Sequence, residues 1–302
     1  MTASRLSLRT ALRMLTTHLV IALVALVVIG GATRVMEAGL ACPDWPLCYG
    51  LLLPGKQMNM QVFLEWFHRL DALLVGLALL SLLVLSLWGR RKFPSWLPWI
   101  SALAVGLVSL QGILGALTVK GLLASPTVTA HLATALVLVL LISGLDQGLA
   151  EQNPTGSLPS WWLASLVFSI SLVMAQCILG ASMASQWAVD HCFTSGEMCE
   201  WVLRHRQLAV LASLSVLTLA ISALFLIRAD VPIRALAVSA TALVALQVTL
   251  GVLSLRAQLQ LPSLTIAHQL VAALLMAHLG ALCGRTLSAW RPATSSMEVS
   301  CG

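Results

Sequence analysis

Eight long apolar runs dominate this chain of 302 residues and restrict its fold more than any other feature. Each run is about 20 residues or longer, which is enough for a helix to cross the hydrocarbon core of a bilayer. Only 9% of the residues are charged, whereas a soluble domain carries about 25%. We therefore predict an all-α integral membrane protein. The expected spans are 15–36, 62–88, 97–118, 127–146, 161–186, 201–227, 235–256 and 263–284.

Basic residues between the runs predict how the chain is oriented. Cytoplasmic loops are enriched in Lys and Arg, so we expect both termini in the cytoplasm. The net charge of +6 is dispersed over loops and does not indicate nucleic-acid binding. The first run is too long for the apolar core of a cleaved signal peptide and is interpreted as a retained helix. The residues expected inside are Arg5, Arg9, Arg13, Arg90, Arg91, Lys92, Arg228, Arg234, Arg285 and Arg291.

The chain contains an internal repeat. The segment Gln111–Lys120 resembles Gln247–Arg256, and each is followed by a proline and then a histidine. We predict two pseudo-symmetric four-helix bundles, an N-terminal half (1–150) and a C-terminal half (151–302), related by an axis along the membrane normal. Two histidine pairs share one offset of 137 residues (205 − 68 and 268 − 131): His68 with His205, and His131 with His268.

These four histidines all fall near the outer starts of expected spans. Polar side chains inside a membrane segment are costly and are usually functional. A neutral imidazole binds iron well, and two from facing helices can hold a heme. Each half therefore offers one heme-sized site. Hydrogen bonding between helices is the alternative, but the duplication favours heme, and zinc or copper would lack further membrane-embedded ligands apart from Glu65.

The two halves differ at Glu65, which lies three residues before His68, whereas the second half has Val202 at the equivalent position. A carboxylate beside one site only could move a proton or stabilise a developing cation. The alternative is an acid that the dipole of a helix N-terminus stabilises.

Cysteines and arginines mark the expected outer loops. An oxidising compartment permits disulfides, and we predict the pairs Cys42–Cys48 and Cys192–Cys199. Each pair either braces its loop or forms a redox-active dithiol. Arginine suits the carboxylates of heme propionates, although snorkelling to the interface is the alternative. The arginines considered for such contacts are Arg34, Arg69 and Arg206.

The sequence resembles the heme A synthase family, in its cysteine-bearing bacterial type. The resemblance covers nearly all eight spans, but in the second outer loop it extends only to the cysteines. It is carried by Gly30–Arg34, Gly39–Gly50, Glu65–Arg69, His131-Leu132, His205-Arg206 and His268-Gln269.

The resemblance implies an oxidoreductase that converts the C8 methyl of heme O into a formyl group, giving heme A for terminal oxidases. It implies that His205 and His268 bind a cofactor heme b, that His68 and His131 belong to the substrate heme site, and that Glu65 is catalytic. It also implies a multi-pass protein of the bacterial inner membrane. Heme O synthase and a quinone or other electron acceptor are candidate partners, and a homo-oligomer stays open.

Two other functions stay open from the sequence. A diheme, quinone-linked electron-transfer subunit of cytochrome b type would need both hemes but no reactive carboxylate at one of them. A heme transporter or chaperone would exchange heme without converting heme O.

Overall fold

A computed structural model of the chain describes residues 2–150, 158–185, 200–226 and 231–289. Within these ranges the regular structure is helical, apart from one β-bridge between Cys48 and Leu51. A 3-10 turn (η1, Gly55–Gln57) precedes the second helix, and a π-helical turn (η2, Ser222–Leu226) continues the sixth. The long helices are α1 Thr2–Val35, α2 Met60–Trp88, α3 Leu97–Lys120, α4 Ser125–Gly148, α5 Ser160–Ser185, α7 Glu200–Ile221, α8 Val231–Arg256 and α9 Pro262–Ala289.

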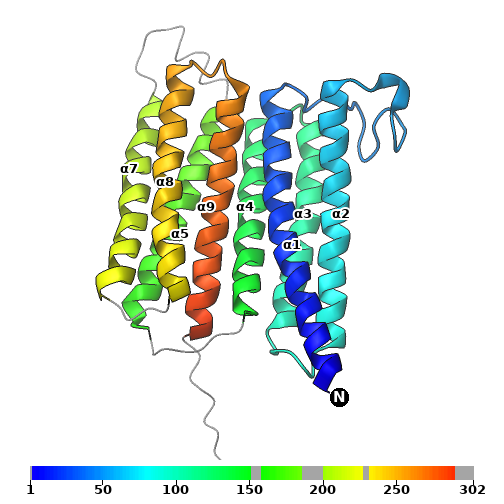
Figure 1. The fold of residues 1–302 in the computed structure, drawn as a ribbon. Coiled ribbons are helices and arrows are strands. Elements are labelled where there is room, and N and C mark those ends of the chain that lie inside the picture. The colour runs from blue at the N-terminus through cyan, green and yellow to red at the C-terminus, as the bar shows by residue number, and fades with distance from the viewer. Residues whose placement is uncertain (1, 151–157, 186–199, 227–230, 290–302) are drawn as a thin grey trace, which may run out of the picture.

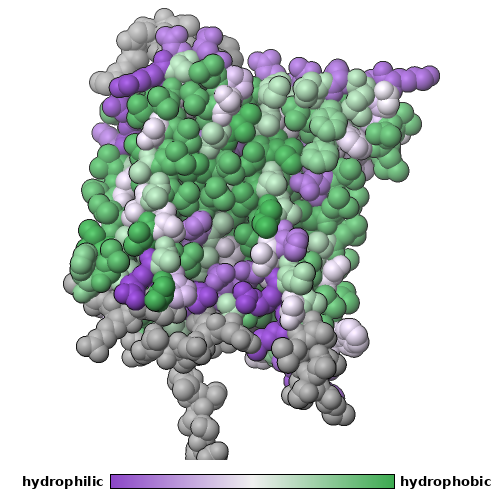
Figure 2. Space-filling model, in the orientation of Figure 1, coloured by the Kyte–Doolittle hydropathy of each residue, from purple (hydrophilic) through white to green (hydrophobic). Residues whose placement is uncertain are grey.

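Eight helices in the described ranges are long and apolar enough to cross a membrane. This confirms the predicted all-α membrane class, and each expected span overlaps one helix. The boundaries differ most at α1, which begins at Thr2 rather than near residue 15. Hydrophobic residues cover the middle of the face drawn in Figure 2, and hydrophilic residues gather toward its two ends. Large apolar side chains such as Leu52, Trp88 and Phe225 are about 80% exposed, which suits a surface in contact with lipid.

The helices stand side by side in two groups, α1 to α4 and α5 with α7 to α9 (Figure 1). Corresponding helices pack in corresponding ways: α1 contacts α2 and α4 as α5 contacts α7 and α9. The tight turns that join α3 to α4 and α8 to α9 are also alike. Each has two successive residues with positive φ, Leu122 and Leu123 in one turn and Gln258 and Leu259 in the other. The sequence repeat therefore has a counterpart in the backbone, while the two-fold axis and the division into halves stay predictions.

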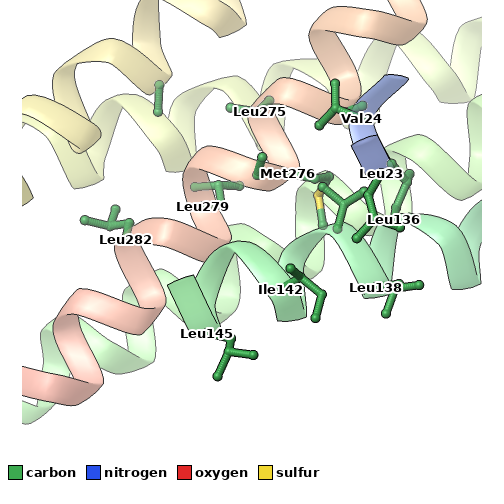
Figure 3. Packing of buried hydrophobic residues seen from close by; sticks show 14 of the residues in the cluster. Leu23, Val24, Leu136, Leu138, Ile142, Leu145, Leu275, Met276, Leu279 and Leu282 are labelled. Carbon is green, nitrogen blue, oxygen red and sulfur yellow. The ribbon is translucent and has the colours of Figure 1, made fainter. Parts of the chain in front are cut away.

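The two groups meet where α4 crosses α9. A Cβ atom added at Gly284 would lie 2.0 Å from the carbonyl oxygen of Gly144, and one at Gly280 would lie 2.4 Å from that of Leu140. Ser143 on α4 donates a hydrogen bond to the Ala277 carbonyl on α9, at 2.6 Å. Small residues that let backbones approach closely are a usual basis of helix association in membranes. Figure 3 shows the leucine, isoleucine and methionine side chains that surround this crossing.

A buried polar cluster ties α1 to α4 near the C-terminal end of α4. The Asp146 carboxylate accepts hydrogen bonds from the hydroxyls of Thr16 and Thr17, each at 2.8 Å. The Gln147 amide donates to the other carboxylate oxygen at 3.1 Å and accepts from Arg285 Nε of α9 at 2.9 Å. Hydroxyl and amide donors offset part of the cost of burying a carboxylate. The cluster fixes the end of the bundle opposite to the histidines.

The glycine crossing generates a prediction for stability. Gly284→Ala should lower the free energy of unfolding by about 1–3 kcal/mol, because the added methyl group meets backbone that cannot move aside cheaply. Gly76→Ala on α2 is the matched control, since a Cβ there meets nothing within 4 Å. Thermal unfolding in detergent, followed by helical circular dichroism, would measure both variants. Equal stability of the two variants would contradict the proposed role of the crossing.

Candidate functional site

Each of the four predicted histidines packs against a glycine of the preceding helix. A Cβ atom added at Gly30 or at Gly180 would lie 2.9 Å from the histidine Cε1 atom, and the corresponding distances are 3.1 Å at Gly251 and 3.6 Å at Gly115. The missing side chains make room for the imidazole rings beside the helix backbone. The pairs are His68 with Gly30, His131 with Gly115, His205 with Gly180, and His268 with Gly251.

The histidines of one half lie on helices that share the same neighbours. His68 on α2 and His131 on α4 belong to helices that both contact α1 and α3. His205 on α7 and His268 on α9 belong to helices that both contact α5 and α8. All four lie within the first three turns of their helices and are partly buried. The structure therefore places the two histidines of each half at the same end of one helix group, while the ligand that they hold stays a prediction.

The hydrogen bonds of the rings differ between the halves. The Gln176 amide nitrogen lies 3.1 Å from both ring nitrogens of His205. In His268, the Nε2 atom lies 3.1 Å from the side-chain amide nitrogen of Gln247. Its Nδ1 atom lies 3.1 Å from the backbone carbonyl oxygen of the same residue. In contrast, Nδ1 of His68 and Nδ1 of His131 are buried without a hydrogen-bond partner.

The histidine surroundings fit a heme. The glycines that face the four rings leave room beside each imidazole that a side chain would otherwise fill, and a neutral imidazole binds iron well. Two imidazoles per half match the two axial positions of a heme iron. Among the described residues, no cluster of three or more His, Cys, Asp and Glu side chains could hold a metal ion instead.

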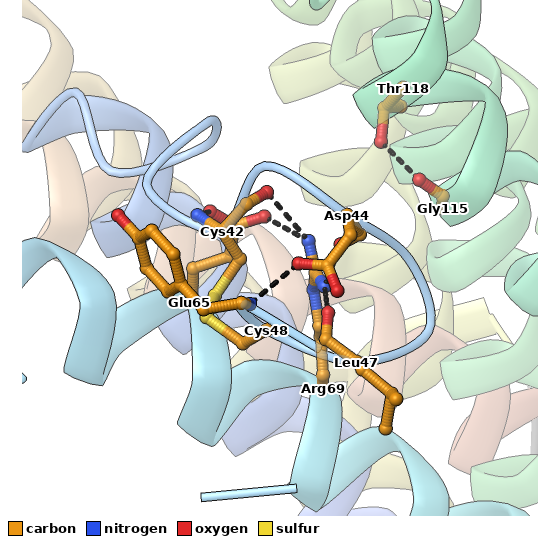
Figure 4. A network of polar contacts seen from close by, with 9 residues as sticks. Cys42, Asp44, Leu47, Cys48, Glu65, Arg69, Gly115 and Thr118 are labelled. Carbon is orange, nitrogen blue, oxygen red and sulfur yellow. Dashed lines mark hydrogen bonds and ion pairs between the residues drawn. A yellow bond between two sulfur atoms is a disulfide. The ribbon is translucent and has the colours of Figure 1, made fainter. Parts of the chain in front are cut away.

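Glu65 is 4% exposed and lies against the loop that joins α1 to α2 (residues 36–59). Its Oε2 atom accepts a hydrogen bond from the Cys42 N–H at 2.7 Å, and its Oε1 atom forms an ion pair with Arg69, one turn further along α2 (Figure 4). Glu65 and His68 are three residues apart, so they lie on neighbouring positions of the same helix face. The loop thus meets the histidine site through this carboxylate.

A disulfide between Cys42 and Cys48 braces the loop 36–59, with 4.8 Å between the Cα atoms of the two cysteines. This confirms the predicted pair, while the pair Cys192–Cys199 lies outside the described residues. The Asp44 carboxylate caps the turn that follows by accepting from the N–H groups of Tyr49 at 2.6 Å and Gly50 at 2.7 Å. The Gly50 N–H lowers the pKa of Asp44 from its ordinary value, and the N–H of Tyr49 adds to this effect.

Arg69 holds the same loop from below. Its terminal nitrogens donate to the carbonyl oxygens of Asp44 at 2.6 Å, of Leu47, and of Cys42 at 3.4 Å, besides the ion pair with Glu65. The sequence offers Arg69 as a contact for a heme propionate. Its terminal N–H groups bind the loop carbonyl oxygens and Glu65, and the propionate contact stays a prediction. Arg34, at the end of α1, and Arg206, in the second turn of α7, are exposed.

Residues 13–279 of the chain match the COX15-CtaA family, described as cytochrome oxidase assembly protein. The chain belongs to this family. Two relatives that match most of the chain support this assignment, one from Staphylococcus saprophyticus and one from Caulobacter vibrioides. Each is 28% identical over 84% of this chain, and the matches cover 88% and 89% of the relatives' own lengths. A third, from Sphingopyxis alaskensis, is 28% identical over 54% of this chain and 56% of its own length.

All three relatives carry the name heme A synthase. The predicted family is therefore confirmed. The contacts of the histidines with glycine and glutamine were not predicted from the sequence. A signal for them was present, because glutamine stands four residues before the glycine in α3, α5 and α8, as Gln111, Gln176 and Gln247.

The loop contacts generate a prediction for Arg69. Arg69→Met should destabilise the protein by about 3 kcal/mol, because it leaves the buried Glu65 carboxylate without its ionic partner. Arg206→Met is the matched control, since this arginine follows the equivalent histidine but is exposed. Thermal unfolding and the rate of proteolysis within residues 36–59 would measure the effect. Similar behaviour of both variants would show that Arg69 does not hold the loop.

Proposed function

We propose that this protein is a heme A synthase that oxidises the C8 methyl of heme O to a formyl group. One observation carries the proposal: two histidine pairs lie in equivalent places, and among the residues that the structure describes a buried carboxylate, Glu65, stands near one pair and none stands near the other. A protein that merely passes electrons between two hemes has no need of this difference. The names of the relatives support the same activity.

In this proposal the halves have different tasks. His205 and His268 of the C-terminal half (151–302) would bind a resident heme b. When bound, that heme supplies one-electron transfer. His68 and His131 of the N-terminal half (1–150) would bind heme O as the substrate. The chain lies in the bacterial inner membrane with both termini in the cytoplasm, so both sites are near the outer face.

Glu65 acts at the substrate site. Conversion of a methyl group into a formyl group takes an oxygen atom from water and releases protons and electrons, and a fixed carboxylate can accept a proton or stabilise positive charge that develops on the carbon. The Cys42 N–H and Arg69 hold its two oxygens, which fixes the carboxylate beside His68. The electrons need an acceptor outside the chain, for which a membrane quinone is our candidate, and heme O synthase is the candidate source of substrate.

The activity test uses membranes that contain this chain and a supply of heme O. Extracted hemes, separated by chromatography, should include heme A. Glu65→Gln should reduce heme A production by a factor of about 100 or more, which is the usual contribution of a proton-transferring group, while the absorption of bound heme persists. Asp71→Asn, another carboxylate on α2, is the matched control and should leave production unchanged. Full heme A production by Glu65→Gln would favour the diheme electron-transfer alternative.

A second prediction separates the two halves. His205→Ala and His268→Ala should remove the heme b spectrum from the purified protein, because each deletes an axial ligand. His68→Ala and His131→Ala should keep that spectrum and lose conversion of heme O. Reduced-minus-oxidised absorption spectra give the first readout and heme extraction gives the second. The reverse pattern would mean that the halves have been assigned the wrong way round.

A further inference from the structure

We propose that Gln176 and the backbone carbonyl of Gln247 hold the imidazole rings of the C-terminal half, so that this half retains its heme, and that Leu26 makes the N-terminal half an exchangeable site. This inference rests on the proposed function. It concerns neither the ligands nor the carboxylate, but the groups that the neighbouring helices place against the imidazole rings.

The four histidine positions share one arrangement on the preceding helix. A glycine faces the ring, and the residue four positions earlier lies one turn away on the same helix face. Three of the four helices have glutamine there: Gln111 on α3, Gln176 on α5 and Gln247 on α8. The fourth, α1, has Leu26 in this position before Gly30. Leucine has no polar group, so α1 offers His68 no side-chain hydrogen bond from this position.

In the C-terminal half both rings are held. The Gln176 amide donates to the backbone carbonyl of His205 at 3.0 Å while lying 3.1 Å from both ring nitrogens. For His268, the Nδ1 atom is 3.1 Å from the backbone carbonyl oxygen of Gln247. An Nδ1–H donated to this oxygen fixes the tautomer in which Nε2 carries no proton. The Gln247 amide lies 3.1 Å from that Nε2 atom and would give way to iron. Gln176 also lies against its ring and restricts the rotation of the ring.

In the N-terminal half neither ring is held in this way. Leu26 leaves Nδ1 of His68 unpartnered, and Nδ1 of His131 is unpartnered as well. Gln111 does not compensate, because its amide donates to the backbone carbonyl of His131, at 2.9 Å, and no bond joins it to the ring. Both imidazoles can therefore turn without breaking a hydrogen bond.

The difference suits the two tasks. A resident cofactor must stay bound through many turnovers, whereas a substrate heme must enter and a product heme must leave. Hydrogen bonds to the distal nitrogen of a ligating histidine orient the ring and typically change metal affinity by about 10–100-fold. The partners of Nδ1 therefore favour retention in the C-terminal half, and their absence favours exchange in the N-terminal half.

The test compares each half by itself in the full-length chain. His68→Ala with His131→Ala leaves only the C-terminal pair, and His205→Ala with His268→Ala leaves only the N-terminal pair. Each protein is loaded with ferric heme b, mixed with excess apomyoglobin, and followed by absorbance to obtain the rate of heme loss. The C-terminal pair should release heme at least roughly tenfold more slowly than the N-terminal pair.

Two changes then test the side chains themselves. Gln176→Leu should speed release from the C-terminal pair about tenfold, and Leu26→Gln should slow release from the N-terminal pair. Gln111→Leu is the matched control and should not alter release from the N-terminal pair. Leu26→Gln adds a contact rather than removing one, so it keeps the proposal testable if the Gln176→Leu variant fails to fold.

The outcomes separate this inference from the proposed function. Unchanged release rates in the Gln176 and Leu26 variants, or equal rates for the two pairs, would overturn the inference even if the native chain makes heme A. A chain whose histidine pairs bind no heme, or that binds heme without converting heme O, would overturn the proposed function as well.

Discussion

The close crossing of α4 and α9 determines how the two groups of helices sit against each other. Gly144, Gly280 and Gly284 bring the two backbones so near that no Cβ atom fits between them. The same two helices carry His131 and His268 near their N-terminal ends, so the crossing links the two sites through α4 and α9. Each of the four imidazoles in turn packs against a glycine of the preceding helix.

On this duplicated scaffold the differences are concentrated around one histidine pair. The turns, glycines and histidines recur in both groups of helices. Glu65 and the contacts of Arg69 with the disulfide loop have no described counterpart at α7, where Val202 and the exposed Arg206 stand instead. The glutamine contacts to the rings, in turn, occur only at His205 and His268. A protein that retains one heme and converts another needs such a difference between its two sites.

The sequence predicted the features that depend on local composition or on the repeat. Apolar run length predicted the eight helices, and the common offset predicted the histidine pairs. The Cys42–Cys48 bond was predictable because a cysteine pair stands in this loop and another in the corresponding loop of the second half. What the sequence did not predict depends on contacts between segments far apart in the chain. The bonds of Arg69 are an example, because the loop carbonyl oxygens lie within its reach and take its N–H groups. A contact of Arg69 with a heme propionate stays a prediction.

Glu65, Arg69 and the disulfide loop act as one unit. A buried carboxylate is tolerated only with compensating partners, and here these are a guanidinium and a backbone N–H that the Cys42–Cys48 bond holds in place. Arg69 also donates to three loop carbonyl oxygens, so the guanidinium is held beside Glu65 by more than the ion pair. The loop, the arginine and the carboxylate therefore keep a fixed arrangement beside His68.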